Sequence, residues 1–481
     1  MTRAVLAAAV LTCLAAAACA INPATGKRQL SLVSQSDEVA MGREADQEIV
    51  ASLGLYPDDA LQRYVQEVGQ RLAAVSERPD LKWTFRVVDD PTVNAFALPG
   101  GFLYVTRGIL AYLTSEAELA AVLGHEIGHV TARHSVTQMS QAQLAQLGLG
   151  LGVALGGDVG RELGWLASQG VGLLFLKFSR DDERQADDLG LRYLVGAGYD
   201  ARPLPGVYEM LRRVGESSGS ERVPGWLSTH PAPENRKARL ESSIAGLGQD
   251  FSGRPIGRSP YHVRIDGIVF GDDPREGYFV EPNRFLHPGL AFQLDFPAGW
   301  KARNEKRRVA AASPEQDGVV QLSLADHKTP DEALAAFLKQ SGVRPTGAWL
   351  ARVGDIAVVS REFAFTSGQD ELLGLIAFFS YDQRVLGLLG YATAAAWPNS
   401  RTTIGAALGS FRRLTDEKAL AVEPWRIGVV TPATSLSVPE FSRRFGATVP
   451  LANLARINQV LESDLLSPGT EYKIVRGGRR P

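Results

Sequence analysis

At 481 residues, the chain is too long for one hydrophobic core, and its length predicts about three domains. A hydrophobic content of 45% and a charged content of 22% are ordinary for a soluble globular protein. The 51 basic and 53 acidic side chains nearly cancel, which argues against the basic surface typical of nucleic-acid-binding proteins.

The N-terminus has the pattern of a bacterial lipoprotein signal peptide. One early arginine precedes a run of Ala, Val and Leu, and small residues lead up to Cys19. Ala17 and Ala18 resemble the lipobox, after which the signal is cut and the cysteine is acylated. We therefore expect residues 1–18 to be the signal and Cys19 to be lipidated; an ordinary signal peptide with an incidental cysteine is the alternative. The most apolar later stretch, residues 147–157, is shorter than the ~20 residues that span a membrane.

Residues 19–250 are predicted to form a mostly helical domain with a small sheet. Apolar residues at helical spacing indicate an amphipathic helix over residues 58–75. The alternation in "LKWTFRVV" predicts a half-buried strand, and "NAFALPGGFLYVTRG" predicts a hairpin after it. Ser115 and Glu118 are then predicted to cap the next helix.

A separate α+β domain is predicted over residues 261–415, after a Gly- and Pro-rich linker at 251–260. It alternates β-rich runs with two helical segments and faintly resembles the PsbP/Mog-type fold; its role is not assigned. Its histidines have no ligand-like spacing and are expected at the surface: His262, His287 and His327.

Residues 424–477 have the pattern strand, helix, helix, strand and resemble a degenerate LysM module. Asn458 and a Pro-Gly pair before the last strand match that module, whereas "PATS" stands where its Gly-Asp-Thr turn would be. The resemblance implies peptidoglycan binding, and a purely structural cap is the alternative. The whole chain is therefore predicted to be an α+β multidomain protein.

The motif "HEIGH" at residues 125–129 has the spacing of a catalytic zinc site. Residues four apart lie on one helical face, so His125 and His129 can direct ring nitrogens at one ion. Glu126 can reach water at the metal without being a ligand and act as general base. A helix that carries two histidines by chance is the alternative. The motif predicts metal-assisted hydrolysis with one Zn²⁺ per chain.

A catalytic zinc needs a third protein ligand. The metzincin pattern would place a histidine at Ser135, and His134 lies about 140° round the helix from the second histidine of the motif, so neither position supplies it. Glu183, in a later predicted helix, is the remaining option, and Asp187 one turn on can accept a hydrogen bond from a ligating imidazole. A solvated acidic helix start is the alternative for these carboxylates. Glu183 is therefore predicted to complete the ligand set.

Three segments, "HEIGHVTARHS", "SRDDERQADDLGLRYLVGAGYD" and "STHPAPENRKARL", resemble in sequence and order the gluzincin family that includes HtpX and the CAAX prenyl proteases. "CAINPATGKRQLSLVS" resembles the exported BepA/LoiP-like branch of that family. The resemblance covers residues 19–240 and implies a zinc metalloendopeptidase. It also implies that a strand at Asn94, Ala95, Phe96 and Ala97 flanks the cleft and pairs with an extended or unfolded polypeptide substrate.

The same resemblance implies a role in protein quality control. The expected enzyme is held by its lipid on the periplasmic side of a bacterial envelope and cleaves misfolded or misassembled envelope proteins. Ala20 after the lipidated cysteine indicates the outer membrane, and no nucleic-acid partner is expected. Two other functions compete: a non-proteolytic assembly chaperone that retains the metal site as a relic, and a peptidoglycan-binding adaptor.

His230 is the least constrained of the predicted catalytic residues. It precedes Pro231, which holds its backbone extended in a loop beyond the two predicted catalytic helices. There it could stabilise the tetrahedral oxyanion or occupy the fourth position on zinc and exclude water. A surface histidine in a Pro-rich turn is the third interpretation.

Overall fold

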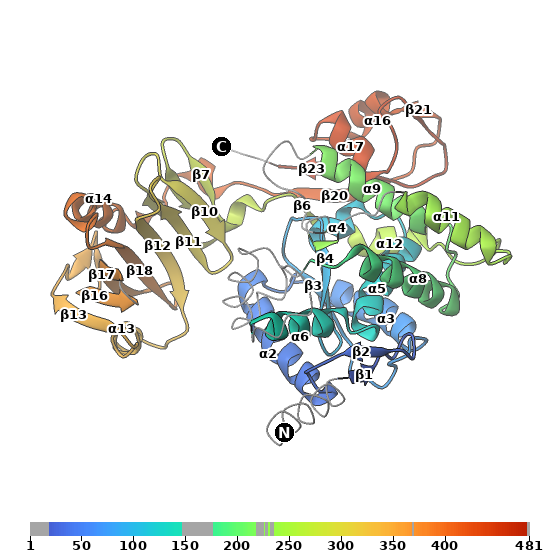
Figure 1. The fold of residues 1–481 in the computed structure, drawn as a ribbon. Helices are drawn as coiled ribbons and strands as arrows, with labels where there is room; N and C mark the ends of the chain where they lie inside the picture. The colour runs from blue at the N-terminus through green and yellow to red at the C-terminus, as the bar shows by residue number, and fades with distance from the viewer. Residues whose placement is uncertain are drawn as a thin grey trace, which may run out of the picture. The chain divides into compact units, whose positions relative to one another are not determined.

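The structure, a computed structural model, describes residues 19–146, 177–217, 226, 229–230, 235–367 and 370–478. It divides into two compact units (Figure 1). The first contains the described residues up to Gly271 together with Arg426–Arg476, and the second contains Asp272–Trp425 and the described residues after Arg476. The α+β, multidomain character is as predicted. The tail, however, shares a unit with the predicted metallopeptidase domain, and the units divide near residues 271 and 425.

A three-stranded sheet lies at the centre of the first unit. It contains β3 (Thr84–Val88), β5 (Phe102–Thr106) and β4 (Ala95–Leu98), in the order β3-β5-β4. β3 is parallel to β5, and β4 is antiparallel to it. The hairpin turns at Gly100 and Gly101, whose φ angles of 80° and 97° favour glycine. The predicted strand and hairpin are confirmed, and β4 is an edge strand.

Helices pack around this sheet and form most of the first unit. α3 confirms the predicted amphipathic helix, because Asp58 caps it and its buried residues recur at helical spacing. A short hairpin of β1 (Cys19–Ile21) and β2 (Arg28–Leu30) precedes them. The helices are α2 (Gln35–Leu53), α3 (Asp59–Ala73), α4 (Arg107–Tyr112), α5 (Glu116–Thr131), α6 (His134–Gln146), α8 (Arg180–Gly196), α9 (Leu204–Ser217), α11 (Arg236–Gly246) and α12 (Arg258–Ile265).

The tail of the chain has the predicted order of strand, helix, helix and strand. Its strand β20 lies between β23 and β6, which precedes the second unit, so the tail completes a sheet that residues near 270 begin. The predicted linker at 251–260 runs into α12 of the same unit. The elements are β6 (Val269–Phe270), β20 (Trp425–Val430), β21 (Leu436–Ser437), α16 (Val438–Phe445), α17 (Leu451–Ile457), β22 (Leu465–Leu466) and β23 (Tyr472–Gly477).

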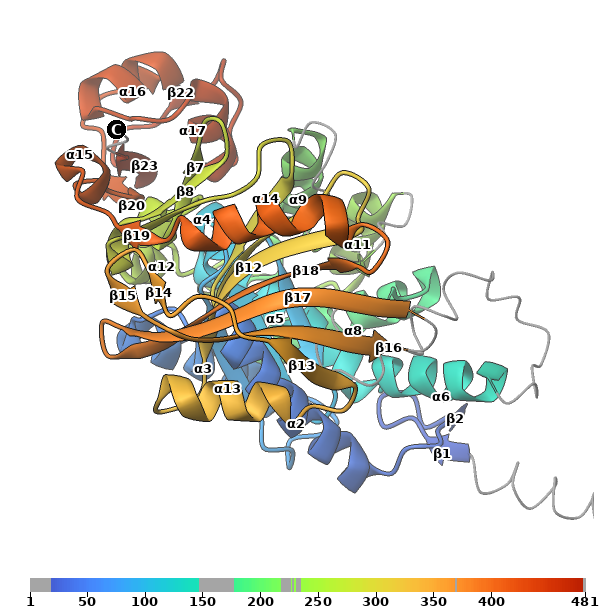
Figure 2. The same cartoon turned by 90° about the vertical axis from the view of Figure 1, so that its left-hand side faces the viewer.

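The second unit is built on a seven-stranded antiparallel sheet. Alternate side chains of β17 point to opposite faces, where α14 covers one face and α13 the other (Figure 2). A four-stranded sheet, in the order β19-β9-β8-β7, packs into the same core as α14. In sheet order the seven strands are β10 (Lys301–Glu305), β11 (Arg308–Ala312), β12 (Gly318–Ala325), β18 (Arg384–Thr393), β17 (Asp370–Tyr381), β16 (Val359–Ser367) and β13 (Val343–Gly347). The remaining elements are the strands β7 (Tyr278–Val280), β8 (Arg284–His287), β9 (Phe292–Asp295), β14 (Arg352–Val353), β15 (Ile356–Ala357) and β19 (Arg412–Arg413) and the helices η2 (Pro274–Glu276), η3 (Pro288–Leu290), α13 (Pro330–Leu338), α14 (Trp397–Gly409) and α15 (Glu417–Leu420).

The histidines of the predicted middle domain are not all surface residues. His327 is exposed, but His262 is 1% exposed and bonds Glu471 of the tail, and His287 caps a short 3-10 helix by accepting a hydrogen bond from the Leu290 amide. The expectation for His262 was wrong. The segment that forms α12 is short and its apolar residues have no clear helical period, so the sequence did not indicate that this helix packs into the first unit.

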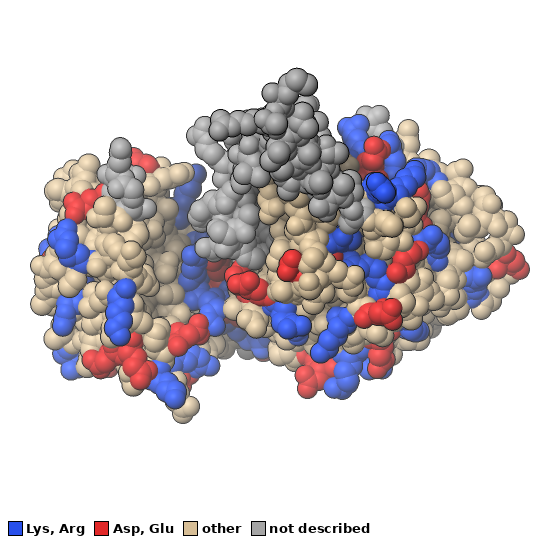
Figure 3. Space-filling model, turned by 60° about the horizontal axis from the view of Figure 1, so that its bottom comes forward, with Lys and Arg blue, Asp and Glu red and all other residues tan. Residues whose placement is uncertain are grey.

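Among the described residues, no helix combines the length and apolar character that crossing a membrane requires. The apolar stretch at 147–157 lies outside the described residues. Positive and negative side chains are mixed over the face shown in Figure 3, in keeping with the net charge of -2.

Candidate metal centre

Helix α5 carries the HExxH motif through the middle of the first unit. Ser115 begins the helix by accepting a hydrogen bond from the Glu118 amide, as predicted. Every residue from Ala117 to Thr131 is buried, so the helix has no solvent face. The motif therefore lies inside the domain, where side chains can be held in one position.

Helix α8 approaches α5 closely because both helices have glycines at their contact. A Cβ atom added at Gly190 would lie 2.9 Å from the backbone nitrogen of His125, and one added at Gly128 would lie 2.9 Å from the Ala186 carbonyl oxygen. The approach brings Glu183, near the start of α8, to the histidines of α5. A capping box between Ser179 and Asp182 fixes where α8 begins.

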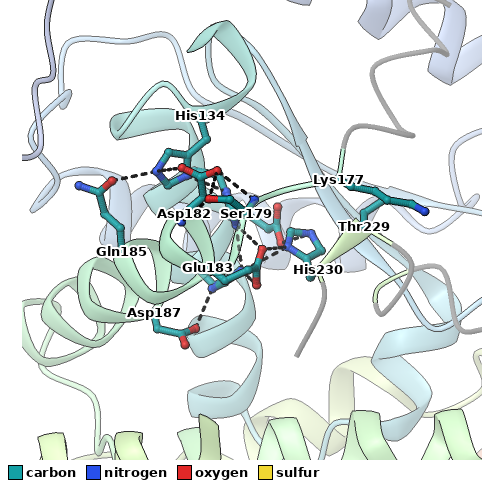
Figure 4. Close-up of polar contacts among 12 residues, drawn as sticks. His134, Lys177, Ser179, Asp182, Glu183, Gln185, Asp187, Thr229 and His230 are labelled. Atoms are coloured by element: carbon teal, nitrogen blue, oxygen red, sulfur yellow. Dashed lines mark hydrogen bonds and ion pairs between the residues drawn. The ribbon is translucent and has the colours of Figure 1, made fainter. Parts of the chain in front are cut away.

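Four donors meet at this contact: His125, His129, Glu183 and His230. One donor atom from each lies within 4.8 Å of all the others, and the four residues are between 0 and 2% exposed. The Nε2 atoms of His125 and His129 are 3.0 Å apart, and Glu183 Oε1 is 3.4 Å from His129 Nε2. The Glu183 side chain points toward His230, whose Nδ1 lies 2.8 Å from Oε1 (Figure 4).

Each histidine of the motif is oriented through its other ring nitrogen. His125 Nδ1 lies 3.1 Å from Asp187 Oδ1, the contact predicted for that aspartate. His129 Nδ1 lies 2.9 Å from Nδ1 of His134, whose Nε2 contacts Gln185. His134 is therefore outside the donor cluster but touches it, because α5 ends after Thr131 and α6 begins at His134 in a new direction (Figure 1).

Arg236 and Tyr208 complete the surroundings of Asp187, and the sequence did not assign either of them. Arg236 donates to both carboxylate oxygens of Asp187, at 2.5 and 2.9 Å, and lies 3.0 Å from Glu183 Oε2. Its guanidinium stacks on the Tyr208 ring at 3.9 Å, and the Tyr208 hydroxyl donates to Asp187. The segment "ENR" shortly after His230 contains Arg236, but only the fold shows that the side chain of this arginine reaches Asp187 on α8.

The pKa shifts of His125, His129 and Glu183 suit a metal. Burial lowers the pKa of His125 and, more strongly, that of His129, so both imidazoles are neutral. Burial would raise the pKa of Glu183, but His230 and His129 outweigh it and keep the pKa below its usual range. At the fourth donor, His230, burial lowers the pKa, but the charges of Glu183 and Glu126 outweigh it and raise the pKa. Burial raises the pKa of Glu126 to about 8, against the opposing effect of His230.

The donor set fits a small tetrahedral cation. Ligands at ~2.0–2.1 Å from zinc lie about 3.3 Å from one another. The observed separations run from 2.8 Å, between His230 and Glu183, to 3.6 Å, between His125 and Glu183, and the motif histidines are 3.0 Å apart. Glu126 Oε1 is buried and has no hydrogen-bond partner among the described residues; it lies 3.6 Å from His230 Nε2. A buried carboxylate oxygen that is free to accept a hydrogen bond can bind and orient an attacking water.

The structure places His230 inside the site. The third interpretation, a surface histidine in a turn, is wrong, because His230 is 1% exposed and its ring stacks on Trp226 at 4.4 Å. Its amide donates to the Trp226 carbonyl.

The predicted substrate strand lies beside the motif helix, since β4 packs on α5. The Thr106 amide donates to the Asn94 carbonyl, which makes this a hydrogen-bonded pair. Alternation then turns the backbone of Phe96 toward β5 and the backbones of Ala95 and Ala97 toward the open edge. Ala97 is half-buried, whereas Ala95 is covered. Cys19 stands at the start of β1, away from these residues in the chain.

Residues 59–244 match the family model described as "Peptidase family M48". The mitochondrial metalloendopeptidase OMA1 of Schizosaccharomyces pombe is 34% identical over 224 residues, which cover 46% of this chain and 64% of that protein. The beta-barrel assembly-enhancing protease of Escherichia coli is 30% identical over 226 residues, 45% of each chain. A putative beta-barrel assembly-enhancing protease of Vibrio cholerae is 32% identical over 283 residues, 57% of this chain and 54% of that protein. The chain thus spans between about half and just under two thirds of these relatives.

Among solved structures, a cyanobacterial PsbP from Synechocystis sp. PCC 6803 is 14% identical and aligns with a TM-score of 0.23 over 27% of this chain and 91% of that chain. The PsbP/Mog-type fold of the second unit therefore stays a prediction.

Proposed function

We propose, from the match of residues 59–244 to peptidase family M48, that this chain is a zinc-dependent endopeptidase of the bacterial envelope. One observation carries the proposal: two helices and a later segment that carries His230 bring four buried donors together beside Glu126. Glu126 accepts no hydrogen bond through Oε1 from any described residue.

His125, His129 and Glu183 are the proposed ligands of a zinc ion, which when bound polarises the scissile carbonyl and acidifies water. Glu126 takes the proton of the attacking water and later returns it to the leaving amine. Asp187 and His134 keep the two imidazoles turned toward the centre, because each contacts the ring nitrogen that faces away. Trp226 and Phe178 flank His230 and help to exclude bulk water.

We further propose that His230 occupies the fourth position and holds the enzyme inactive. Its Nδ1 lies 2.8 Å from Glu183 Oε1 and 3.4 Å from His125 Nε2, within the donor cluster. The oxyanion role requires the same ring to withdraw and face the substrate carbonyl. His230→Ala distinguishes the two: faster peptide cleavage supports the inhibitory role, and a fall of about a hundredfold supports the oxyanion role. His327→Ala, at an exposed site in the second unit, is the control.

The substrate is proposed to be an extended or unfolded polypeptide that pairs with β4. The open edge offers the backbone groups of Ala97, and backbone pairing reads few side chains, so sequence specificity is loose. Ala97→Pro removes the edge amide and is expected to raise KM for an unfolded substrate more than it lowers kcat. Ala97→Ser, which keeps the amide, is the matched control.

Lipidation of Cys19, location at the outer membrane and a quality-control role on misassembled envelope proteins are part of the proposal. Their support is the lipobox-like sequence and relatives named beta-barrel assembly-enhancing proteases. Mass spectrometry of the mature chain is expected to show a diacylated N-terminal Cys19, and an unmodified N-terminus elsewhere would reject the anchor. Two acyl chains hold a protein firmly, at about 0.8 kcal/mol per buried CH₂.

Peptidoglycan binding by residues 424–477 is a separate proposal, supported by the LysM-like order of their elements. The full chain is expected to sediment with purified sacculi. As the control, the chain should remain in solution after the sacculi have been digested. A chain that stays in solution with intact sacculi contradicts it.

The central test is metal analysis and caseinolytic activity of the purified chain without its signal segment. One zinc per chain and activity that a chelator abolishes are expected. A non-proteolytic assembly chaperone, the alternative function, would instead retain its effect on envelope assembly when Glu126 is replaced by Gln.

A further inference from the structure

Lys473 of the tail is a fully buried lysine that the proposed catalytic mechanism does not use. It lies on β23 and has 0% exposure. Its ammonium donates to the carbonyl oxygens of Ala111 and Leu113, at 2.8 and 2.6 Å. An ammonium is buried at high cost unless a partner of opposite charge lies near.

Glu118, in the first turn of the motif helix α5, is the acidic group whose charge acts on Lys473. Glu118 is 5% exposed, and its carboxylate accepts from the amide and hydroxyl of Thr114. Burial lowers the pKa of Lys473 to about 7 against the opposing charge of Glu118, and burial raises that of Glu118 against Thr114 and Lys473. Gln459 of the tail donates to Glu118 and to the carbonyl of Tyr112, which lies between the two residues whose carbonyls Lys473 binds.

These contacts also cap the corner between α4 and α5. The last carbonyls of a helix have no partner within it, and a cation is favourable there. The carbonyl of Leu110 accepts from Tyr261, those of Ala111 and Leu113 accept from Lys473, and that of Tyr112 accepts from Gln459. The tail thus supplies the donors for three successive carbonyls at the end of α4.

Asn458, the residue that the tail shares with LysM modules, holds the lysine strand in place. Its side-chain amide donates to the carbonyls of Leu454 and Lys473, and its oxygen accepts from the Lys473 amide. The two tail residues that reach α4, Gln459 and Lys473, are therefore fixed to one another through the turn after α17 and the start of β23.

We propose that Lys473 is a positioning residue for the metal site, and that the tail is a built-in part of the peptidase. Glu118 and His125 are seven residues apart on α5, about two turns along nearly the same face. A displacement of Glu118 therefore moves the face that carries the histidine. This inference rests on the proposed peptidase function and concerns a residue far from the reacting atoms.

Lys473→Met tests the inference because methionine keeps an unbranched stem and removes the charge. It leaves Glu118 buried without its cation, and kcat is expected to fall by between about ten- and a hundredfold with little change in KM. The double variant Glu118→Gln/Lys473→Met leaves no unpaired charge. Its kcat is expected to be at least about tenfold higher than that of Lys473→Met, since the effects of mutations at coupled sites are not additive. Arg443→Met, at an exposed site on α16 of the tail, is the matched control.

Hydrogen exchange gives a readout that does not need activity. Lys473→Met is expected to speed exchange in residues 113–125, at the α4–α5 corner, and to leave β17 and β18 of the second unit unchanged. The inference would be overturned if Lys473→Met and the double variant had equal effects on both readouts. It would also be overturned if residues 113–125 of Lys473→Met exchanged at the wild-type rate. A wild-type chain that binds no zinc would instead refute the proposed function and leave the exchange result to decide the inference.

Discussion

Glu126 and Glu183 are neighbouring buried carboxylates with different predicted roles. Glu183 contacts both motif histidines and is the anionic member of the donor set, whereas Glu126 Oε1 has no hydrogen-bond partner among the described residues. We predict that Glu126→Gln retains zinc while hydrolysis falls by about 10²–10⁴-fold, because the amide cannot carry the proton. Glu183→Gln should weaken zinc affinity beyond the about 10–100-fold expected for losing an outer partner. Zinc titration beside casein cleavage checks both, and equal zinc binding by the two variants contradicts the assignment.

His287 gives the second unit a pH dependence. Burial lowers the pKa of its imidazole from 6.5 to about 4, so the folded state holds it neutral while the unfolded chain protonates it. Its contribution to stability is complete above pH 6.5 and is lost as the pH falls toward 4, by about 3 kcal/mol in total. His287→Asn can still accept the Leu290 hydrogen bond but does not titrate.

We predict that the loss of unfolding free energy between pH 7.5 and pH 4.5 is smaller in His287→Asn than in the wild type. Urea unfolding followed in the second unit measures it, and His327→Asn, at an exposed position, controls for the removal of a histidine. Identical losses in all three proteins would show that His287 does not carry the dependence.

At the scale of helices and strands, the sequence predicted what depends on local period. The amphipathic helix at 58–75, the hairpin around Pro99 and the cap at Ser115 formed as expected, since each is determined by neighbours in the chain. Two of the four clustered donors, His125 and His129, were predictable because their spacing along α5 places them on one face. Lys473 was not, since its role depends on a contact with residues 360 positions away.

Close packing of α5 on α8 should be essential for the metal site. Ala at Gly190 would place a Cβ atom 2.9 Å from His125 N and 3.1 Å from the Gly124 carbonyl carbon, and neither backbone atom can move alone. We predict that Gly190→Ala separates the helices, costs about 1–3 kcal/mol of stability and weakens zinc binding. Gly246→Ala is the control, because nothing lies within 4 Å of its added Cβ on α11. If Gly190→Ala bound zinc like the control, the contact would not set the ligand geometry.

At the scale of the whole molecule, the chain folds as two units that do not follow its linear order. The first unit contains the beginning and the tail of the chain, and the second is inserted between them. Prediction from sequence divides a chain into consecutive domains. The tail was therefore predicted as a separate module, although it belongs to the first unit. Only pairings between distant segments, such as β20 with β6, show the closure.

Metal removal should therefore affect the two units unequally. A ligand that binds only the folded state stabilises it by RT ln(1 + [L]/Kd), about 4 kcal/mol when free zinc is a thousand times Kd. All four donors lie in the first unit, so a chelator should speed hydrogen exchange in α5 and α8 and leave β17 and β18 unchanged. Because the tail belongs to the same unit, we predict that α17 and β23 lose protection together with α5. Mass spectrometry of exchanged peptides measures all these segments in one experiment, with addition of excess zinc as the reversal control. A tail that keeps its protection while α5 loses it would mean that the tail unfolds independently of the metal domain.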